Sequence, residues 1–309
     1  MSRSRCGFAL VQARGGKFGD KVYLCANGKR HYVPSVDRLK HYGFKWPQDL
    51  QQVSDEVLMA FQIGGWLPEI LPHENIKSDS IKSSMTMREY VAAQLKGIGL
   101  EVGAATSPFP VPIGCKVLYG DRIPHEQLVA SLYPGQVEFE LVRSDLITDF
   151  GDFNGIADQS LDFIIGCHVI EHVFDPIGTL INAYRALRLG GMLVLVIPDR
   201  DRTFDRRRPL TELDHLLIDH EQPDPQRDYG HYEEFYRLAF KTPSDQLRSK
   251  VEHQFRCRGD LHVHVWNYQT FMEMIAYVNK NFVRWSNIWS HQTLSDEKND
   301  IEFYFTLTK

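Results

Sequence analysis

Several features are scarce or missing in this 309-residue sequence, and each absence excludes a class of protein. The longest strongly apolar run, Met192 to Pro198, is far shorter than the ~20 residues that a membrane-spanning helix needs. The N-terminus has no continuous apolar stretch and no small-residue cleavage site, so we expect no secretion signal. The chain has no excess of basic residues, since its net charge is −5, and this argues against nucleic acid as the main partner.

Cysteine is also used sparingly. The five cysteines are scattered, odd in number and contain no CxxC pair. This pattern predicts neither a disulfide framework nor a zinc finger. Isolated thiols are typical of a reducing compartment, so we expect a cytoplasmic protein. Apolar residues at 43% and charged residues at 24% are otherwise ordinary for a globular chain.

The first 75 residues differ in pattern from the rest. Two β-prone runs, 22–25 and 30–33, flank Asn27-Gly28, which predicts a hairpin. Helical turns are expected at 36–42 and 53–59, and the Gly- and Pro-rich stretch 64–72 reads as a link. The sequence therefore predicts a small α+β module at 1–75, for docking or substrate presentation, and a larger domain at 76–309.

Strand and helix patterns alternate in the larger domain. Strands are expected at 98–102, 115–119, 137–142, 161–167, 192–197, 282–289 and 301–308, and helices at 86–96, 175–189 and 270–278. Alternation of this kind indicates βαβ units. We therefore predict an α/β fold with a mainly parallel, doubly wound sheet.

A loop of small residues follows the first of these strands. Gly103 to Ser107 would let backbone amides approach a ligand, although a tight structural turn would have the same composition. Asp121 ends the second strand, 18 residues after Gly103, where an acid can accept the hydroxyls of a ribose. Ala105 stands where GxGxxG would have its second glycine. Because alanine at positive φ is strained by ~1 kcal/mol, another loop shape is expected.

Two further segments carry a family resemblance. SLDFIIGCHVIEHVFDP (160–176) and RALRLGGMLVLVIPD (185–199) resemble the class I S-adenosylmethionine-dependent methyltransferases of the type 11 group. The resemblance implies a Rossmann-like fold and S-adenosylmethionine as cofactor. It assigns cofactor contacts to Glu101, Gly103, Ala105, Asp121, Asp145, Leu146 and Cys167. The segment 147–160, which precedes the fourth strand, is longer than is usual in this family.

A second resemblance concerns the acceptor. DRDRTFDRRRPLTELDHLLIDHE (199–221) and HVHVW (262–266) are similar to a bacterial subgroup whose members accompany glycosyltransferases in surface-glycan pathways. This implies O-methylation of a sugar hydroxyl, on a surface glycan or on its nucleotide-sugar or phospho-sugar precursor. It also implies a glycosyltransferase partner.

Eight of the thirteen histidines lie between His168 and His264, the region expected to hold the acceptor. His168, directly after the fourth strand, is the first candidate for a general base, and His172 is the second. The candidates for substrate contacts are Arg200, Arg202, His215, His231, His262 and His264.

These histidines have other interpretations. With His220 and Glu221 they could form a metal site, since His215 and Asp219 share a helix face. No HExxH or comparable signature is present, so no metal is predicted, and a polar network or scattered surface histidines remain open. The five arginines at 200–208 could bind an anion or neutralise the three interleaved aspartates.

Two rival functions remain at this point. A catalytically inactive methyltransferase-like scaffold would explain Ala105 and the docking-like N-terminal module. A nicotinamide-dependent sugar-modifying enzyme would need GxGxxG and a tyrosine–lysine pair, and neither can be placed.

Overall fold

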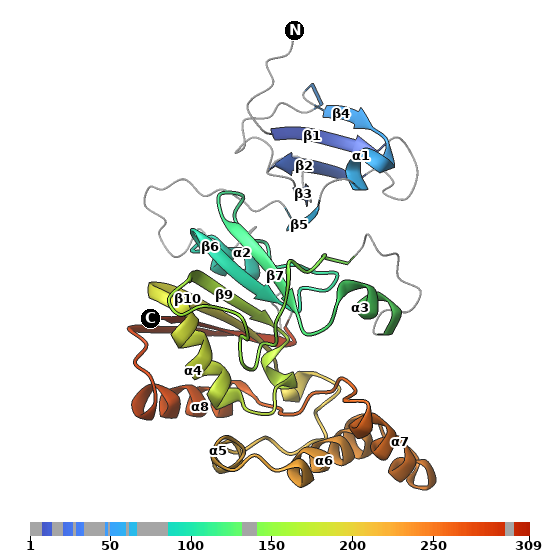
Figure 1. Ribbon diagram of the computed structural model, residues 1–309, viewed down its shortest axis with the longest axis vertical. Coiled ribbons are helices and arrows are strands. Elements are labelled where there is room, and N and C mark those ends of the chain that lie inside the picture. The colour runs from blue at the N-terminus through green and yellow to red at the C-terminus, as the bar shows by residue number, and fades with distance from the viewer. Residues whose placement is uncertain are drawn as a thin grey trace. The chain divides into compact units, whose positions relative to one another are not determined.

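The structure of the protein is a computed structural model (Figure 1) that describes residues 8–13, 21–26, 29–33, 47–48, 50–59, 62–66, 86–131, 141–293 and 300–309. The chain forms two compact units, Met1–Ile147 and Thr148–Lys309. None of the helices described is long and apolar enough to cross a membrane.

The first unit contains eight described strands and three α-helices. The strands are β1 (Phe8–Ala13), β2 (Val22–Ala26), β3 (Lys29–Tyr32), β4 (Leu50–Val53), β5 (Gln62–Trp66), β6 (Ile98–Val102), β7 (Lys116–Asp121) and β8 (Leu146–Ile147). The helices are α1 (Asp55–Met59), α2 (Met87–Ala92) and α3 (His125–Ser131).

The second unit contains four described strands, five α-helices and three short helical turns of other types. The strands are β9 (Leu161–Cys167), β10 (Leu187–Pro198), β11 (Asn287–Gln292) and β12 (Glu302–Thr308). The helices are α4 (Pro176–Ala186), α5 (Leu213–Glu221), α6 (Pro225–Glu234), α7 (Ser244–Arg256) and α8 (Tyr268–Asn281). The turns are η4 (Ile170–His172), η5 (Arg200–Arg202) and the π-helical η6 (Phe235–Ala239).

The N-terminal module is built on a five-stranded sheet with the order β4-β1-β2-β3-β5. Antiparallel pairing of β2 with β3 confirms the strands of the predicted hairpin, whose turn at 27–28 lies outside the described residues. The segment 62–66 is strand β5, parallel to β3, so the expectation that a link begins at Gly64 was wrong. The expected helix at 36–42 and the expected domain boundary near residue 75 also lie outside the described residues.

Both faces of this small sheet bury apolar side chains. Leu10, Val22 and Leu24 share one core cluster, whereas Val11 and Tyr23 belong to another. Successive strand residues point to opposite faces, so the two clusters lie on the two sides of the sheet. A leucine of α1, at position 58, completes the second cluster. The helical turn therefore closes one face of the module.

The larger sheet has seven strands in the order β11-β12-β10-β9-β6-β7-β8. Within the first unit, β6, β7 and β8 pair in parallel, and within the second β9 is parallel to β10. Strand β12 runs antiparallel to both β10 and β11. This order confirms the predicted α/β, doubly wound Rossmann-like sheet of the class I methyltransferase type.

The third predicted strand was misplaced. Residues 137–140 lie outside the described residues, 141–142 are not in a strand, and β8 is Leu146–Ile147. The N–H of Asp145 donates to the carbonyl of Tyr119 at 2.7 Å just before β8 begins. The short strand therefore starts several residues later than its apolar pattern predicted.

Helix α4 begins where it was predicted and ends early. Asp175 caps it by accepting a hydrogen bond from the N–H of Gly178 at 2.7 Å, and Pro176 occupies the first turn. The helix ends at Ala186 because strand β10 already starts at the next residue, with a register irregularity before position 192. Gly190 has φ +80°, a conformation that suits glycine and allows this irregularity.

The last two strands also differ slightly from expectation. Strand β11 is Asn287–Gln292, five residues later in its start than predicted, whereas β12 lies within the predicted 301–308. Helix α4 packs against β10 and α8, and α6 packs beside α7 (Figure 1). Residues 193–197 of β10 are fully buried, as their continuous apolar run predicts.

Candidate functional site

The loop after β6 has the backbone conformation of a tight ligand-binding turn. Gly103 has φ +71° and Ala105 has φ 46°, so alanine adopts the left-handed conformation that glycine normally occupies. The expectation that Ala105 would force another loop shape was therefore wrong. The chain keeps the shape at a cost of ~1 kcal/mol. The Ala105 carbonyl accepts a hydrogen bond from the N–H of Val142 at 2.9 Å.

Glu101 holds this loop in place from the end of β6. Its side chain is buried, and Oε1 accepts a hydrogen bond from the N–H of Phe109 at 2.8 Å. Burial, together with the nearby carboxylates of Glu101 and Asp145, raises the pKa of Tyr119 well above its usual value. Glu101 therefore fixes the end of the loop by accepting a backbone hydrogen bond.

Asp121, Asp145 and Leu146 lie at the ends of the next two strands. Asp121 is the last residue of β7 and is half-buried, and its Oδ1 lies 3.5 Å from the N–H of Ile123. Asp145 is exposed, and its Oδ2 accepts from the N–H of Tyr119 at 2.9 Å. Leu146 opens β8 and is half-buried.

This donor set fits S-adenosylmethionine. The loop that starts at Gly103 has two residues in the left-handed conformation, and a turn of this kind can offer backbone amides to an anionic group. The carboxylate of Asp121 can accept the hydroxyl hydrogens of a ribose. Exposed Asp145 and half-buried Leu146 offer an acceptor and an apolar contact to an adenine ring. In the bound cofactor these residues would hold the methionine end, the ribose and the base.

In the second unit, His168 follows β9 directly and forms a pair with a buried carboxylate. Its Nε2 lies 2.8 Å from Oε2 of Glu302, which is the first residue of β12. The hydroxyl of Tyr304 donates to the other oxygen of Glu302. With Glu302 ionised, its carboxylate accepts the proton of Nε2, and Nδ1 then has the lone pair. His168 also has φ 54°, an uncommon backbone conformation.

Cys167 and His172 flank this pair in the sequence. Cys167 ends β9, is half-buried and pairs with Val196. His172 is the last residue of η4, and its Nδ1 lies 3.1 Å from Oδ1 of Asp260. The two candidate bases are therefore oriented by different carboxylates.

A second group of side chains gathers around Glu171. Nε2 of His172 and Nε2 of His262 both lie 3.9 Å from Oε1 of Glu171, whose carboxylate oxygens are buried without a hydrogen-bond partner. Nδ1 of His262 lies 2.6 Å from Oδ2 of Asp205. Burial alone would raise the pKa of Asp205, but hydrogen bonds from His262 and Arg208 hold it below its usual value. We call Glu171, His172 and His262 the Glu171 cluster.

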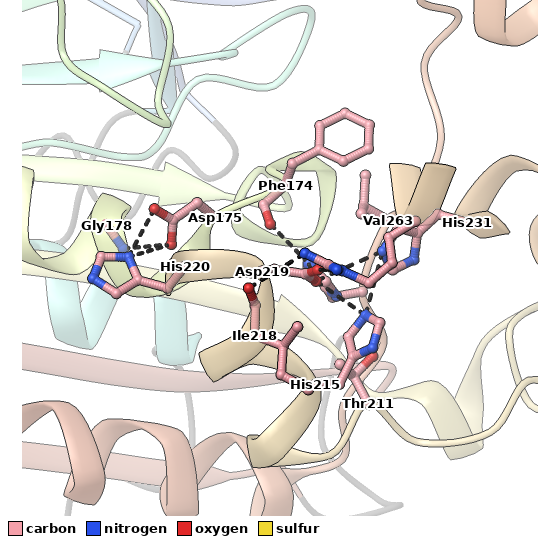
Figure 2. Close-up of polar contacts among 12 residues, drawn as sticks. Phe174, Asp175, Gly178, Thr211, His215, Ile218, Asp219, His220, His231 and Val263 are labelled. Carbon is pink, nitrogen blue, oxygen red and sulfur yellow. Dashed lines mark hydrogen bonds and ion pairs between the residues drawn. The ribbon is translucent and has the colours of Figure 1, made fainter. Parts of the chain in front are cut away.

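The third group brings together three predicted substrate residues and one aspartate. Figure 2 shows His215, Asp219 and His231 pointing toward one another from α5 and α6, and His264 lies beside them. Their nitrogen and oxygen atoms all lie within 4.8 Å of one another. Burial lowers the pKa of His264 well below its usual value, so this imidazole is neutral. We call these four residues the Asp219 cluster.

His220 and Glu221 do not join either cluster. Nδ1 of His220 lies 2.9 Å from Oδ2 of Asp175, the residue that caps α4, and Glu221 is exposed (Figure 2). His220 therefore links the end of α5 to the start of α4. The histidines of this region thus divide into two clusters and one structural contact.

The arginine loop is occupied by contacts within the protein. Arg202 donates to the carbonyls of Thr293 and Asp300 at 2.8 and 2.7 Å. Arg200 donates to the carbonyl of residue 206 at 3.2 Å. Arg208 is fully buried and pairs with the carboxylate at position 205 at 3.0 Å. The loop therefore has the internal pairing that its interleaved aspartates suggested, and substrate binding by Arg200 and Arg202 stays a prediction.

Sequence reasoning missed Glu171 and Glu302. Glu302 lies 134 residues from His168 along the chain, so no local spacing could have paired them. The last strand was predicted from its alternating pattern, but no sequence motif marks an acidic residue at the start of a strand as a functional residue. Asp219 was recognised only by its helical spacing from His215.

Comparisons with known proteins identify one domain of the chain. A family model described as a methyltransferase domain matches residues 98–195. No curated protein matches the chain. Among solved structures it is similar to an S-adenosylmethionine-dependent methyltransferase from Thermotoga maritima, with 16% identity over 72% of this chain and 87% of that chain and a TM-score of 0.39. A second such methyltransferase, from Methanosarcina mazei, has 13% identity over 74% of this chain and 99% of that chain and a TM-score of 0.36.

The matched residues run from the start of β6 into β10 and include the loop after β6, Asp121 and the turn after β9. The match covers about a third of the chain and leaves the N-terminal module and α5 to α8 outside it. Residues 98–195 therefore form a methyltransferase domain with the class I, Rossmann-like sheet, and its cofactor is S-adenosylmethionine.

Proposed function

We propose that this protein O-methylates a sugar hydroxyl, with His168 as the general base. The observation that carries the proposal is the short contact between Nε2 of His168 and the buried carboxylate of Glu302. S-adenosylmethionine supplies an electrophilic methyl group on a sulfonium. A hydroxyl attacks such a methyl group in line and has to lose its proton during the transfer.

The His168–Glu302 pair suits the removal of that proton. Glu302 holds the proton on Nε2, which leaves Nδ1 to accept the hydroxyl proton from the acceptor. The negative charge of Glu302 then stabilises the imidazolium that forms. Glu302 thus acts as a positioning residue, and Tyr304 fixes its second oxygen.

The acceptor class rests on two features. The resemblance of 199–221 and 262–266 to a glycan-associated bacterial subgroup suggests a surface glycan or its nucleotide-sugar or phospho-sugar precursor. Half-buried polar side chains, among them His168, His172 and His262, offer the mixed donors and acceptors that a polyol requires. Such precursors are made in the cytoplasm, where we also place this enzyme, beside a glycosyltransferase that would use or supply the acceptor.

Calorimetry with S-adenosylhomocysteine tests the cofactor side of the proposal, and NADH serves as the comparison ligand. We expect binding of S-adenosylhomocysteine alone, with loss of binding in Asp121→Ala and normal binding in the exposed control variant Asp245→Asn. Absence of binding by folded protein would favour an inactive scaffold. Binding of NADH instead would favour the nicotinamide enzyme.

A transfer assay tests the acceptor and the base. Nucleotide sugars and sugar phosphates are incubated with the protein and with S-adenosylmethionine carrying a labelled methyl group, and products are identified by mass spectrometry. With the acceptor found, His168→Ala should lower kcat about 10²–10⁴-fold while S-adenosylhomocysteine binding is unchanged. Added imidazole should restore part of that rate. A normal rate in His168→Ala would show that His168 is not the base.

Glu302→Gln separates positioning from a merely structural role. We expect kcat to fall and KM and the melting temperature to stay close to their original values. Glutamine keeps the shape of the side chain but loses its charge and exchanges one accepting oxygen for a donating NH2, whose proton the Tyr304 hydroxyl can accept. An equal loss of stability and activity would assign Glu302 to folding alone.

A further inference from the structure

We propose that His215, Asp219, His231 and His264 bind one divalent transition-metal ion, with Zn²⁺ as the best match. Three imidazoles and one carboxylate form a set of nitrogen and oxygen ligands that zinc commonly uses. The proposal concerns a site apart from the His168–Glu302 pair and does not depend on the methylation reaction.

The distances fit a four-coordinate ion. Nε2 of His215 lies 3.0 Å from Oδ2 of Asp219 and 3.4 Å from Nε2 of His231. Nε2 of His231 and Nε2 of His264 lie 3.8 and 3.9 Å from the same Oδ2. A tetrahedral ion with metal–ligand distances of ~2.0–2.1 Å has ligand atoms ~3.3 Å apart. The ligand atoms are therefore spaced to surround one ion with small adjustments.

Hydrogen bonding alone accounts poorly for this arrangement. Three imidazole nitrogens converge on one carboxylate oxygen, and two of the nitrogens, those of His215 and His231, lie 3.4 Å apart. In such a contact one nitrogen has to donate and the other has to accept. An ion between them would be bound by both lone pairs at once.

The other oxygen of Asp219 is held from outside the cluster. Nε of Arg227 donates to Oδ1 at 2.6 Å, and this contact orients Oδ2 toward the three imidazoles. Metal ligands commonly have an outer partner of this kind, which sets their direction.

One group competes with the ion for His264. Its Nε2 lies 3.3 Å from the carbonyl oxygen of Phe174, which accepts the proton when that nitrogen carries it. Metal binding needs the other tautomer, with the proton on Nδ1. The ring is completely buried, and a neutral imidazole can carry its proton on either nitrogen.

The placement of the ligands indicates a structural ion. They come from α5, from α6 and from the segment next to Trp266, which bridges to Asp199 at the end of β10. Four protein ligands leave a tetrahedral ion no open position for substrate. Within the cluster, His215 alone is more than a third exposed, so the ion would enter from its side. The ion would join α5 and α6 to the end of the sheet.

Metal analysis of the full-length protein, purified without a histidine tag, tests the site. We expect about one zinc per chain to remain after gel filtration, and Co²⁺ exchanged into the site to give the intense visible absorption of a tetrahedral complex. His215→Ala, on the exposed side, should lower zinc affinity more than the ~10–100-fold that loss of an outer partner costs. His253→Ala, an exposed histidine on α7, is the matched control and should keep the zinc.

Further variants guard against misfolding and against the neighbouring cluster. Asp219→Asn keeps the shape of the side chain and should also lose zinc, with circular dichroism reporting whether the variant is folded. His262→Ala removes a member of the Glu171 cluster and should leave zinc in place. Zinc that remains in both His215→Ala and Asp219→Asn, or a wild-type protein that binds neither Zn²⁺ nor Co²⁺, would overturn the proposal.

Discussion

Gly166, the second-to-last residue of buried strand β9, should not tolerate any side chain. A Cβ atom added there would lie 2.2 Å from Cζ of Phe150 and 2.7 and 2.9 Å from its two Cε atoms. Ordinary carbon contacts are ~3.5–4.0 Å, so the ring tip has to retreat by about 1.3 Å. Phe150 is 2% exposed and packs edge-on against Phe153 at 5.1 Å, and so has little room to retreat.

Gly166→Ala should therefore destabilise the protein by ~1–3 kcal/mol, the usual cost of overpacking a core. The melting temperature should fall by about 2–4 °C for each kcal/mol, and urea unfolding should report the same loss. Since Cys167 and His168 follow directly, displacement of the strand should also lower methyl transfer if His168 is the base.

A double-mutant cycle isolates the cause. Phe150→Leu removes the ring tip and should cost on the order of 1 kcal/mol by itself. In that background Gly166→Ala should lower the free energy of unfolding by less than ~0.5 kcal/mol, because the ring atoms that would overlap with the new methyl group are absent. If Gly166→Ala costs the same in the wild-type and in the Phe150→Leu background, contact with the ring does not explain the glycine.

Three further changes test other parts of the structure. Ala105→Gly should leave stability unchanged or raise it by up to ~1 kcal/mol, because glycine relieves the left-handed strain, whereas the neighbouring Ala104→Gly should be destabilising in the same thermal scan. Arg208→Lys should lower the free energy of unfolding in urea by ~3–5 kcal/mol, because the buried guanidinium pairs with Asp205 and Glu234 and donates to two backbone carbonyls. A decrease below ~1 kcal/mol would contradict this explanation. Burial raises the pKa of Cys25 to about 11, so a thiol reagent at neutral pH should label exposed Cys257 and spare Cys25 until the protein unfolds, as peptide mass mapping would show.

The central sheet was predictable because its signals are local and repeated. Residues 161–167 are mostly apolar and residues 192–197 are a continuous apolar run, and each forms a buried strand of the parallel pair. Element ends were harder to predict. Helix α4 stops at Ala186 and not at Leu189, because pairing of Leu187 with Leu161 replaces the last helical turn. That competition depends on a partner strand and leaves no mark in the helical pattern.

The candidate site was predictable only where it follows a strand. His168 was identified by its position after β9, but Glu302 was not, because their contact joins residues 134 positions apart. The histidines at 215, 231 and 264 were recognised as a polar group, yet sequence could not separate them from His220 or from His262. The two clusters draw their residues from different segments of the chain, and no spacing rule describes which segments meet.

Strand β12 runs against its neighbour β10, and this reversal brings the beginning of a strand to the functional edge. Glu302 pairs with Pro198 at the carboxyl end of β10, while Cys167 pairs with Val196 close by. Side chains alternate along a strand, so deleting one residue from 303–308 would turn Glu302 to the opposite face or shift the buried phenylalanines out of the core. The length of this last strand is therefore as tightly constrained as its composition, although it lies far in sequence from the turn that it supports.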